Sequence, residues 1–312
     1  MQRVVVAHGG TASSPKEKDG TDRAVEAGMR ELKRGEGPIE AAVAACVVLE
    51  DDERFNAGTG SNFRFDGRTI EMDAAVMDSR RRYGAVSGIQ RVKNPVLVAR
   101  KLMEMPDNIL GGLGATRFAR TMGMEDHDPA TQGARERWQE AIDGILSGEA
   151  SGSENPWKLE TLRERWNYER PFDEVLGNKA ERKLPKAARS SAGQETIGAV
   201  AYDGITFAAA ASTGGTIATL LGRIGDTPNI GAGLYAGEFG AVACSGNGNV
   251  LLRERTATKI HQWMGGGDLA EQALRRFVAT LSHDTDFFGV AIGRREYAAL
   301  GNREIAWSAR ED

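Results

Sequence analysis

The chain has few of the residues that most often build metal sites or disulfide scaffolds. Of its 312 residues, only two are cysteines and four are histidines. The histidines are scattered, and the sequence contains no His-Glu-x-x-His or Cys-x-x-Cys spacing, so we expect no catalytic metal and no cofactor. We interpret Cys46 and Cys244 as buried thiols in a reducing compartment, although the sequence leaves a disulfide between them open.

Long apolar runs and a strong charge imbalance are also missing. The apolar run at 4–7 is too short for the core of a signal peptide, and no stretch approaches the length of a membrane span. The formal net charge is −4, which is too small to indicate nucleic-acid binding. We therefore expect a cytoplasmic protein whose partners include neither nucleic acid nor membrane.

Three common motifs are absent or incomplete as well. The segment His8-Gly9-Gly10-Thr11 follows an apolar run, but no Gly-Lys-Ser/Thr completes a phosphate-binding loop. Gly231-Ala232-Gly233 lacks the third glycine of a dinucleotide fingerprint, which leaves a Rossmann fold as a weak alternative. No Gly-x-Ser-x-Gly occurs, so a serine triad of the α/β-hydrolase type is not indicated.

The hydrophobic content of 40% and the length allow a sizeable core in one large or two small domains. Apolar periodicity predicts strands at 3–8, 70–77, 84–89, 196–202, 205–211, 240–244, 287–292, 296–300 and 304–308. It predicts helices capped by Thr21, starting at Pro38, and spanning 96–103, 251–264 and 268–281. Strands follow strands and helices follow helices, which favours packed sheets covered by helices.

Residues 128–192 differ from the rest of the chain. They are charged and helix-prone, and a Ser/Gly-rich segment at 147–153 interrupts them. We interpret this region as a poorly packed surface linker of two helices around a hinge, docked by Trp138, Trp157 and Trp166.

Small polar residues lie beside glycines in the C-terminal half. Thr196 begins a strand-like segment, and a threonine there is usually structural. Three further segments follow within 60 residues, and each places polar side chains next to glycines that let a ligand approach the backbone. They are Ser212-Thr213-Gly214-Gly215, Gly222-Arg223-Ile224-Gly225-Asp226 and Ser245-Gly246-Asn247-Gly248.

In this order, the segments resemble the plant-type asparaginase and isoaspartyl peptidase family. The resemblance covers about residues 3–125 and 193–255, and it is absent from 128–192, where the family has a variable linker. Segments of the first half that carry it are His8-Gly9-Gly10, Phe55-Asn56-Ala57-Gly58-Thr59-Gly60, Met72-Asp73-Ala74-Ala75-Val76-Met77-Asp78 and Lys93-Asn94-Pro95.

The resemblance implies an α+β fold, the four-layer αββα sandwich of the N-terminal nucleophile hydrolases. It also implies a single-domain precursor, 1–312, cut between Glu195 and Thr196 into an α subunit, 1–195, and a β subunit, 196–312. A threonine hydroxyl is a poor nucleophile without a base. Cleavage would free an α-amine with a pKa of about 7.7, which is suited to act as that base.

Further roles carry over from the resemblance. Thr196 would be the nucleophile, Thr213 would hydrogen-bond it, and Asn56 would support it. The Ser245 hydroxyl and the Gly246 N–H would form the oxyanion hole.

The resemblance assigns substrate binding to the next segment. Arg223 would bind the substrate α-carboxylate and Asp226 its α-ammonium, whereas without the family pattern the two would be interpreted as a surface pair in a turn. Glu195 stands where the family often has Gly or Asp, and Ser245 and Asn247 stand where Thr and often His are usual. These departures concern the processing rate and the substrate preference.

The implied activity is hydrolysis of β-aspartyl amide bonds in L-asparagine, in isoaspartyl dipeptides, or in both. Alternatives are a glycosylasparaginase, a threonine aspartase, which lacks the acid matching Asp226, and a binding protein that never matures. The family also implies a homodimer of processed αβ protomers, with a small-molecule or dipeptide substrate. It further implies a structural sodium or potassium ion held by loop carbonyls between Leu49 and Phe55.

Overall fold

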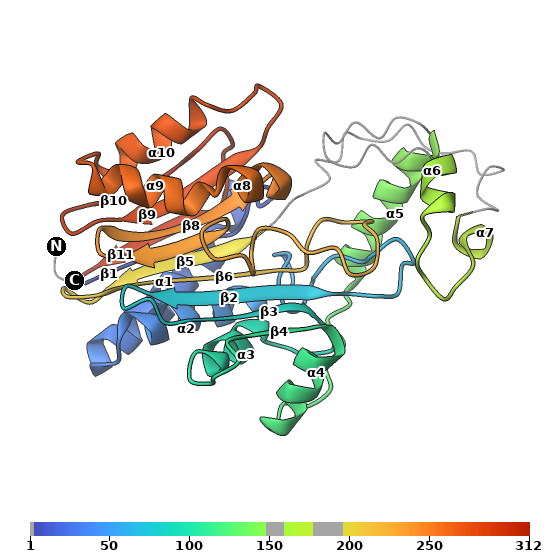
Figure 1. Ribbon diagram of the computed structural model, residues 1–312, viewed down its shortest axis with the longest axis horizontal. Helices are drawn as coiled ribbons and strands as arrows, with labels where there is room; N and C mark the ends of the chain where they lie inside the picture. Colours follow the sequence, from blue (N-terminus) through green and yellow to red (C-terminus); the bar gives the residue numbers. More distant parts are fainter. Residues whose placement is uncertain (1–2, 148–158, 177–195) are drawn as a thin grey trace.

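Two β-sheets form the centre of the computed structural model, which describes residues 3–147, 159–176 and 196–312 (Figure 1). Among these residues, one sheet has seven strands, antiparallel except for the last pair. In spatial order they are β11 (Trp307–Glu311), β1 (Val4–His8), β5 (Ile197–Tyr202), β6 (Phe207–Thr213), β2 (Met72–Asp78), β3 (Tyr83–Ile89) and β4 (Ile109–Gly111). The other sheet is antiparallel, with the order β10 (Tyr297–Gly301), β9 (Phe287–Ile292), β8 (Gly240–Gly246) and β7 (Leu234–Gly237).

Alternate residues of each central strand enter different hydrophobic clusters. On β1, Val5 and Ala7 pack toward the helices, whereas Val4 and Val6 pack between the sheets. A strand covered on both faces must be apolar throughout, which explains the uninterrupted run at 4–7. The cluster between the sheets is rich in alanine, from Ala75 on β2 to Ala241 and Ala243 on β8.

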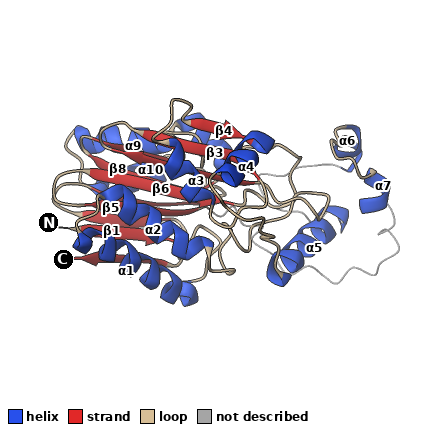
Figure 2. Cartoon of the chain, turned by 90° about the horizontal axis from the view of Figure 1, so that it is seen from below, coloured by secondary structure: helices blue, strands red, loops and turns tan. Residues whose placement is uncertain are grey.

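Helices cover the outer face of each sheet (Figures 1 and 2). The seven-stranded sheet is covered by η1 (Pro15–Glu17), α1 (Lys18–Arg34), α2 (Pro38–Glu50), α3 (Pro95–Leu102) and α4 (Gly112–Thr121). The four-stranded sheet is covered by α8 (Gly248–Glu254), α9 (Thr256–Gly265) and α10 (Ala270–Val278). The structure is thus a mixed α/β arrangement with two sheets, and its predicted helix start at Pro38 is confirmed.

Several predicted element ends are wrong. Thr21 does not cap a helix; it lies inside α1, and Ser14 caps the preceding 3-10 turn in a box with Glu17. The helix predicted over 251–264 breaks at Arg255, whose φ of 51° is left-handed. The strand predicted at 304–308 begins only at Trp307, because the Ala306 amide donates to the Ser13 hydroxyl instead of to a neighbouring strand. Strands β4 and β7 and helix α4 were not predicted.

The region expected to be a poorly packed linker has a hydrophobic cluster of its own in its described part. Helices α5 (Gln132–Ser147), α6 (Leu159–Glu164) and α7 (Phe172–Val175) bury apolar side chains against Phe65 and Ile217. Trp166 packs on Phe65 with ring centroids 6.3 Å apart. The expectation of a poorly packed linker is therefore wrong for these helices, whereas Trp157 and most of the 147–153 hinge lie outside the described residues.

Two minor expectations concern thiols and membranes. Cys46 and Cys244 are buried and free, as predicted, so no disulfide joins them. None of the helices in the described part of the chain is long and apolar enough to cross a membrane.

Candidate active site

The predicted nucleophile lies where ends of strands from both sheets meet. In the β5–β6 pair Ile197 is opposite Ser212, so one residue further along Thr196 is opposite Thr213. Because side chains alternate along a strand, both threonines project toward the second sheet, as Val200 and Ala211 do. Strand β8 ends nearby at Ser245 and Gly246 and packs on β5. The loop from β6 to β7 extends from this end toward α5 (Figure 1).

Thr196 is buried and bonded through both its nitrogen and its hydroxyl. Its backbone nitrogen donates to the Ser245 hydroxyl at 3.2 Å, and its own hydroxyl lies 2.8 Å from that of Thr227. Thr227 is a contact that sequence reasoning missed. Thr213, which was expected to bond the nucleophile, accepts a hydrogen bond from the Gly215 amide at 2.9 Å.

The Ser245 hydroxyl joins three parts of the chain. It accepts from the Thr11 amide at 3.1 Å as well as from Thr196, and it lies 3.3 Å from the Thr11 hydroxyl. We call Thr11, Thr196, Thr227 and Ser245 the hydroxyl cluster. With two N–H groups donating to its oxygen, Ser245 can direct its own hydrogen to another acceptor. Gly246 has a φ of 151°, and a side chain there would clash with the Asp286 carbonyl oxygen at 2.3 Å.

Asn56 supports the loop that follows Thr213. Its side-chain amide donates to the Gly215 carbonyl at 2.9 Å, and its side-chain oxygen accepts from the Asn62 amide at 2.8 Å. Its own carbonyl accepts from the Gly214 amide at 2.9 Å. Asn56 is fully buried, so it fixes the backbone beneath the site.

Charged groups lie next to the hydroxyl cluster. Arg223 and Asp226 flank Gly248, where an added Cβ would lie 2.9 Å from an Arg223 guanidinium nitrogen and 2.9 Å from Asp226 Oδ1. Asp226 is only 5% exposed, so the interpretation as a surface pair is wrong. Burial raises the pKa of Asp226 to about 6, although the nearby Arg223 acts in the opposite direction.

These charged groups lack partners among the described residues. The Arg223 guanidinium forms no hydrogen bond or ion pair with any of them, and Asp226 Oδ2 is buried without a hydrogen-bond partner. Unsatisfied buried polar groups are rare and often mark a ligand site. Asp73 on β2 is a further case, with Oδ2 buried and unpartnered. We call Asp73, Arg223 and Asp226 the charged wall.

A family model described as Asparaginase matches residues 1–303. A plant-type L-asparaginase of Pyrococcus abyssi is 40% identical over 268 residues, which is 82% of this chain and 78% of the relative. An isoaspartyl peptidase/L-asparaginase of Danio rerio is 33% identical over an alignment of 327 positions, covering 100% of this chain and 93% of the relative.

The chain belongs to the asparaginase family. It is therefore a hydrolase, and the resemblance found in its motifs is confirmed. The Glu195 side of the expected cleavage site lies outside the described residues.

The loop expected to hold an alkali metal in this asparaginase-family chain follows α2. Glu50, the last residue of α2, is fully buried. Its carboxylate accepts from the Val96 amide at 3.0 Å, and burial raises its pKa to about 8. In the described part of the chain, no three or more His, Cys, Asp or Glu side chains gather to hold a metal.

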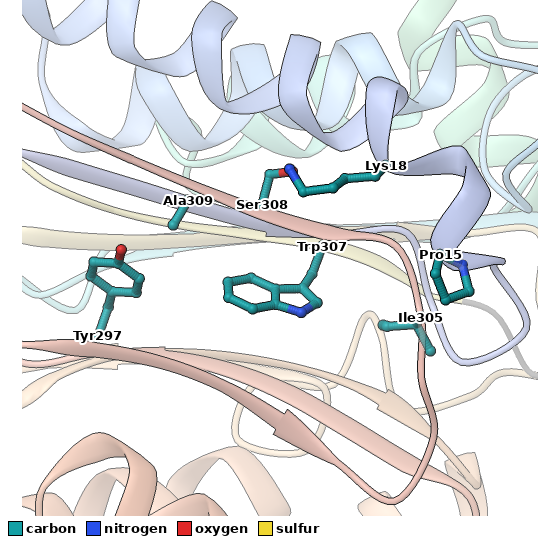
Figure 3. A pocket seen from close by; sticks show the side chains of 7 residues that line it. All are labelled: Pro15, Lys18, Tyr297, Ile305, Trp307, Ser308 and Ala309. Carbon is teal, nitrogen blue, oxygen red and sulfur yellow. The ribbon is translucent and has the colours of Figure 1, made fainter.

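A cleft of about 370 Å³ lies away from the hydroxyl cluster, between β10 and β11 (Figure 3). It is lined by Tyr297, Trp307 and Lys18, among others. The Lys18 ammonium already bonds Asp22 and the Ser308 hydroxyl, the latter at 3.2 Å. The lysine of this cleft is thus already engaged. None of the residues that line the cleft belongs to the hydroxyl cluster or the charged wall.

Proposed function

We propose that this chain is the precursor of an N-terminal threonine amidohydrolase. In this proposal the single domain 1–312 cuts itself between Glu195 and Thr196, giving subunits 1–195 and 196–312. The mature enzyme hydrolyses β-aspartyl amide bonds, in L-asparagine, isoaspartyl dipeptides or both. The observation that carries the proposal is the burial of Thr196 at the start of β5, with its nitrogen directed at Ser245 and its hydroxyl at Thr227.

The finer description of the fold belongs to the same proposal. Two packed sheets, each covered on its outer face by helices, suit the αββα sandwich of the N-terminal nucleophile hydrolases. In that arrangement the nucleophile starts a strand at the edge of the layer between the sheets, which is where Thr196 lies.

The chemistry explains why the precursor needs cleavage. As a peptide nitrogen, Thr196 N can only donate, because its lone pair is delocalised. As a free amine with a pKa of about 7.7, it can take the proton from the Thr196 hydroxyl, which then attacks the amide carbon. The Ser245 hydroxyl and the Gly246 N–H would stabilise the oxyanion, and the amine would return the proton to the leaving nitrogen. Water then releases aspartate from the acyl-enzyme.

Thr213 and Asn56 have supporting roles in this proposal. They hold the loop at 213–215 through the Gly215 amide and carbonyl, each at 2.9 Å. This loop borders Thr196 because β5 and β6 are paired. A fixed loop keeps the hydroxyl cluster in position for attack.

Substrate recognition is assigned to the charged wall. The Arg223 guanidinium and Asp226 Oδ2, which have no hydrogen-bond partner among the described residues, suit the α-carboxylate and α-ammonium of a free aspartyl head. Asp226 argues against the threonine-aspartase alternative, whose substrate has no free α-amine. The matching relatives carry the names L-asparaginase and isoaspartyl peptidase, which favours these substrates over glycan-linked asparagine.

The test combines intact-mass analysis with a substrate panel. Aged protein is expected to give two fragments with Thr196 at the new N-terminus, and to release aspartate from L-asparagine or a β-aspartyl dipeptide. A chain that stays whole and binds these compounds without turnover would be the non-catalytic binding protein. Turnover only of glycan-linked asparagine would make it a glycosylasparaginase. The homodimer, the alkali metal at 49–55 and the cytoplasmic location stay predictions.

A further inference from the structure

Asp73 lies in the same row of the seven-stranded sheet as Thr196. It pairs with Thr213 across β2 and β6, and Thr213 is opposite Thr196 on β5. Directly opposed residues of antiparallel strands project from the same face, so the three side chains form a line facing the second sheet. The strand that carries Asp73 is far from Thr196 in sequence, and the family pattern, although it includes the segment at 72–78, assigned Asp73 no role.

The carboxylate of Asp73 accepts a hydrogen bond from β3, and the Gly225 amide, which lies between Arg223 and Asp226 in the chain, also lowers the pKa of Asp73. A bulge between Met72 and Ala74 interrupts the pairing of β2 with β3 at this residue. The Gly88 amide of β3 donates to Asp73 Oδ1 at 2.8 Å. Asp73 Oδ2 is buried and has no hydrogen-bond partner in the described parts of the chain, and the residue is 1% exposed. A bulge that re-aims a side chain is a common device next to an active site.

The neighbours of Asp73 are the other members of the charged wall. Burial raises the pKa of Asp73 to about 6, while the guanidinium groups of Arg64 and Arg223 act in the opposite direction. Asp73 in turn raises the pKa of Asp226. Arg64 is already engaged with Glu71 at 3.0 Å, so Arg223 is the cation left for the two aspartates. The charge of Asp226 also helps burial to raise the pKa of the Cys244 thiol.

We propose that Asp73 is a positioning residue that orients the Arg223 guanidinium and, together with Asp226, makes the site select substrates with a free α-ammonium group. This inference rests on the proposed function. One guanidinium and two carboxylates leave the wall with one negative charge in excess. A zwitterionic aspartyl head adds no net charge, whereas a ligand with the carboxylate but no ammonium adds a second negative charge and is repelled.

The experiment compares Asp73→Asn with the wild type on L-asparagine and on succinamate, which lacks the α-ammonium. Asn keeps the size and can still accept from Gly88. We expect KM for L-asparagine to rise about tenfold, with kcat within about threefold, because the negative charge that attracts and orients the Arg223 guanidinium is lost. The preference for L-asparagine over succinamate should fall by about tenfold. The pH below which KM rises should move downward from about 6, because Asp226 loses its negative neighbour.

Asp78→Asn is the matched control. Asp78 is another buried aspartate, at the opposite end of β2, where it pairs with Arg82 and caps a turn. Its loss should lower stability without changing KM, the substrate preference or the pH profile. If Asp73→Asn matches the wild type in KM and in preference, the inference is overturned while the proposed function stands.

Two further measurements cover the remaining outcomes. If Asp73→Asn does not fold, the pH profile of the wild type decides the question. A log KM that rises by two for each unit of pH decrease below pH 5 supports two carboxylates, and a rise of one overturns the role of Asp73. If the wild type hydrolyses nothing, the proposed function fails. Calorimetric titration then measures the affinities of the wild type and of Asp73→Asn for L-aspartate and for succinate. A smaller preference for L-aspartate in Asp73→Asn than in the wild type supports the inference. The same preference in both proteins, or no binding, overturns it.

Discussion

The hydroxyl cluster and the charged wall lie side by side but differ in how their polar groups are satisfied. In the hydroxyl cluster, Thr196, Ser245 and Thr227 bond one another or the backbone at 2.8–3.2 Å. In the charged wall, Asp226 and Asp73 each keep a buried oxygen without a hydrogen-bond partner among the described residues. Within the described residues, the first region satisfies its polar groups, and the second leaves oxygens to which a ligand could bind. Self-cleavage should therefore depend on the first region, and turnover of small substrates on both.

The largest effect is expected from Thr196→Ala, which removes the nucleophile from the hydroxyl cluster. Both self-cleavage and amide hydrolysis should fall by at least about a thousandfold, because both reactions use the same hydroxyl. Intact mass over several days and aspartate release are the measurements. A Thr196→Ala protein that still divides into two fragments would show that the cut is made by another residue or by a protease.

The charged wall gives the next largest effect. Asp226→Ala and Arg223→Lys should raise KM for L-asparagine about tenfold to a hundredfold, since each loses a charge-assisted contact and lysine cannot supply the two-pronged donor. Self-cleavage should survive both changes, because the scissile peptide has no free aspartyl head. The two readouts are the processed fraction and kcat/KM.

The opposite results for these variants are equally informative. Loss of self-cleavage in a folded Asp226→Ala protein would show that the wall and the hydroxyl cluster are one unit. Unchanged kcat/KM after full processing would remove the free α-amine from the proposed substrate and favour the threonine-aspartase alternative.

How much the sequence predicts differs between the same two regions. Thr196, Ser245 and Arg223 stand beside glycines in segments that the family pattern contains, so sequence reasoning found them. Thr227 lies outside those segments, and Asp73 lies in one of them but has no neighbouring glycine and was given no role. Thr227 meets Thr196 only because of how the 214–230 loop folds back, and Asp73 joins the row only through the register of β2 on β6. Contacts set by strand register or loop path leave no trace in local spacing.

The helices and strands likewise divide into those that local sequence patterns predict and those that depend on distant contacts. Strands in the two-sided core were found because they are apolar without interruption, as Val4 to Ala7 are. The error at 304–308 arose because Ile305 and Ala306 are buried and apolar but belong to an irregular segment. The charged helices α5–α7 were interpreted as loosely packed because their partners, Phe65 and Ile217, lie in distant loops.

The smallest effect is expected from Thr227→Val, which tests whether the hydroxyl cluster acts as one unit. Valine keeps the shape of the fully buried Thr227 and removes only the oxygen that lies 2.8 Å from the Thr196 hydroxyl. One neutral hydrogen bond contributes about 0.5–1.5 kcal/mol, so kcat and the self-cleavage rate should both fall by roughly threefold to tenfold, with KM unchanged. Thr227→Ser should restore both rates because it restores the oxygen. Thr280→Val is the control, since the Thr280 hydroxyl donates to the Phe277 carbonyl at 2.7 Å, near the end of α10 and outside the hydroxyl cluster. If Thr227→Val raises KM and leaves both rates unchanged, Thr227 belongs with the charged wall, and the boundary between the two regions lies between Thr196 and Thr227.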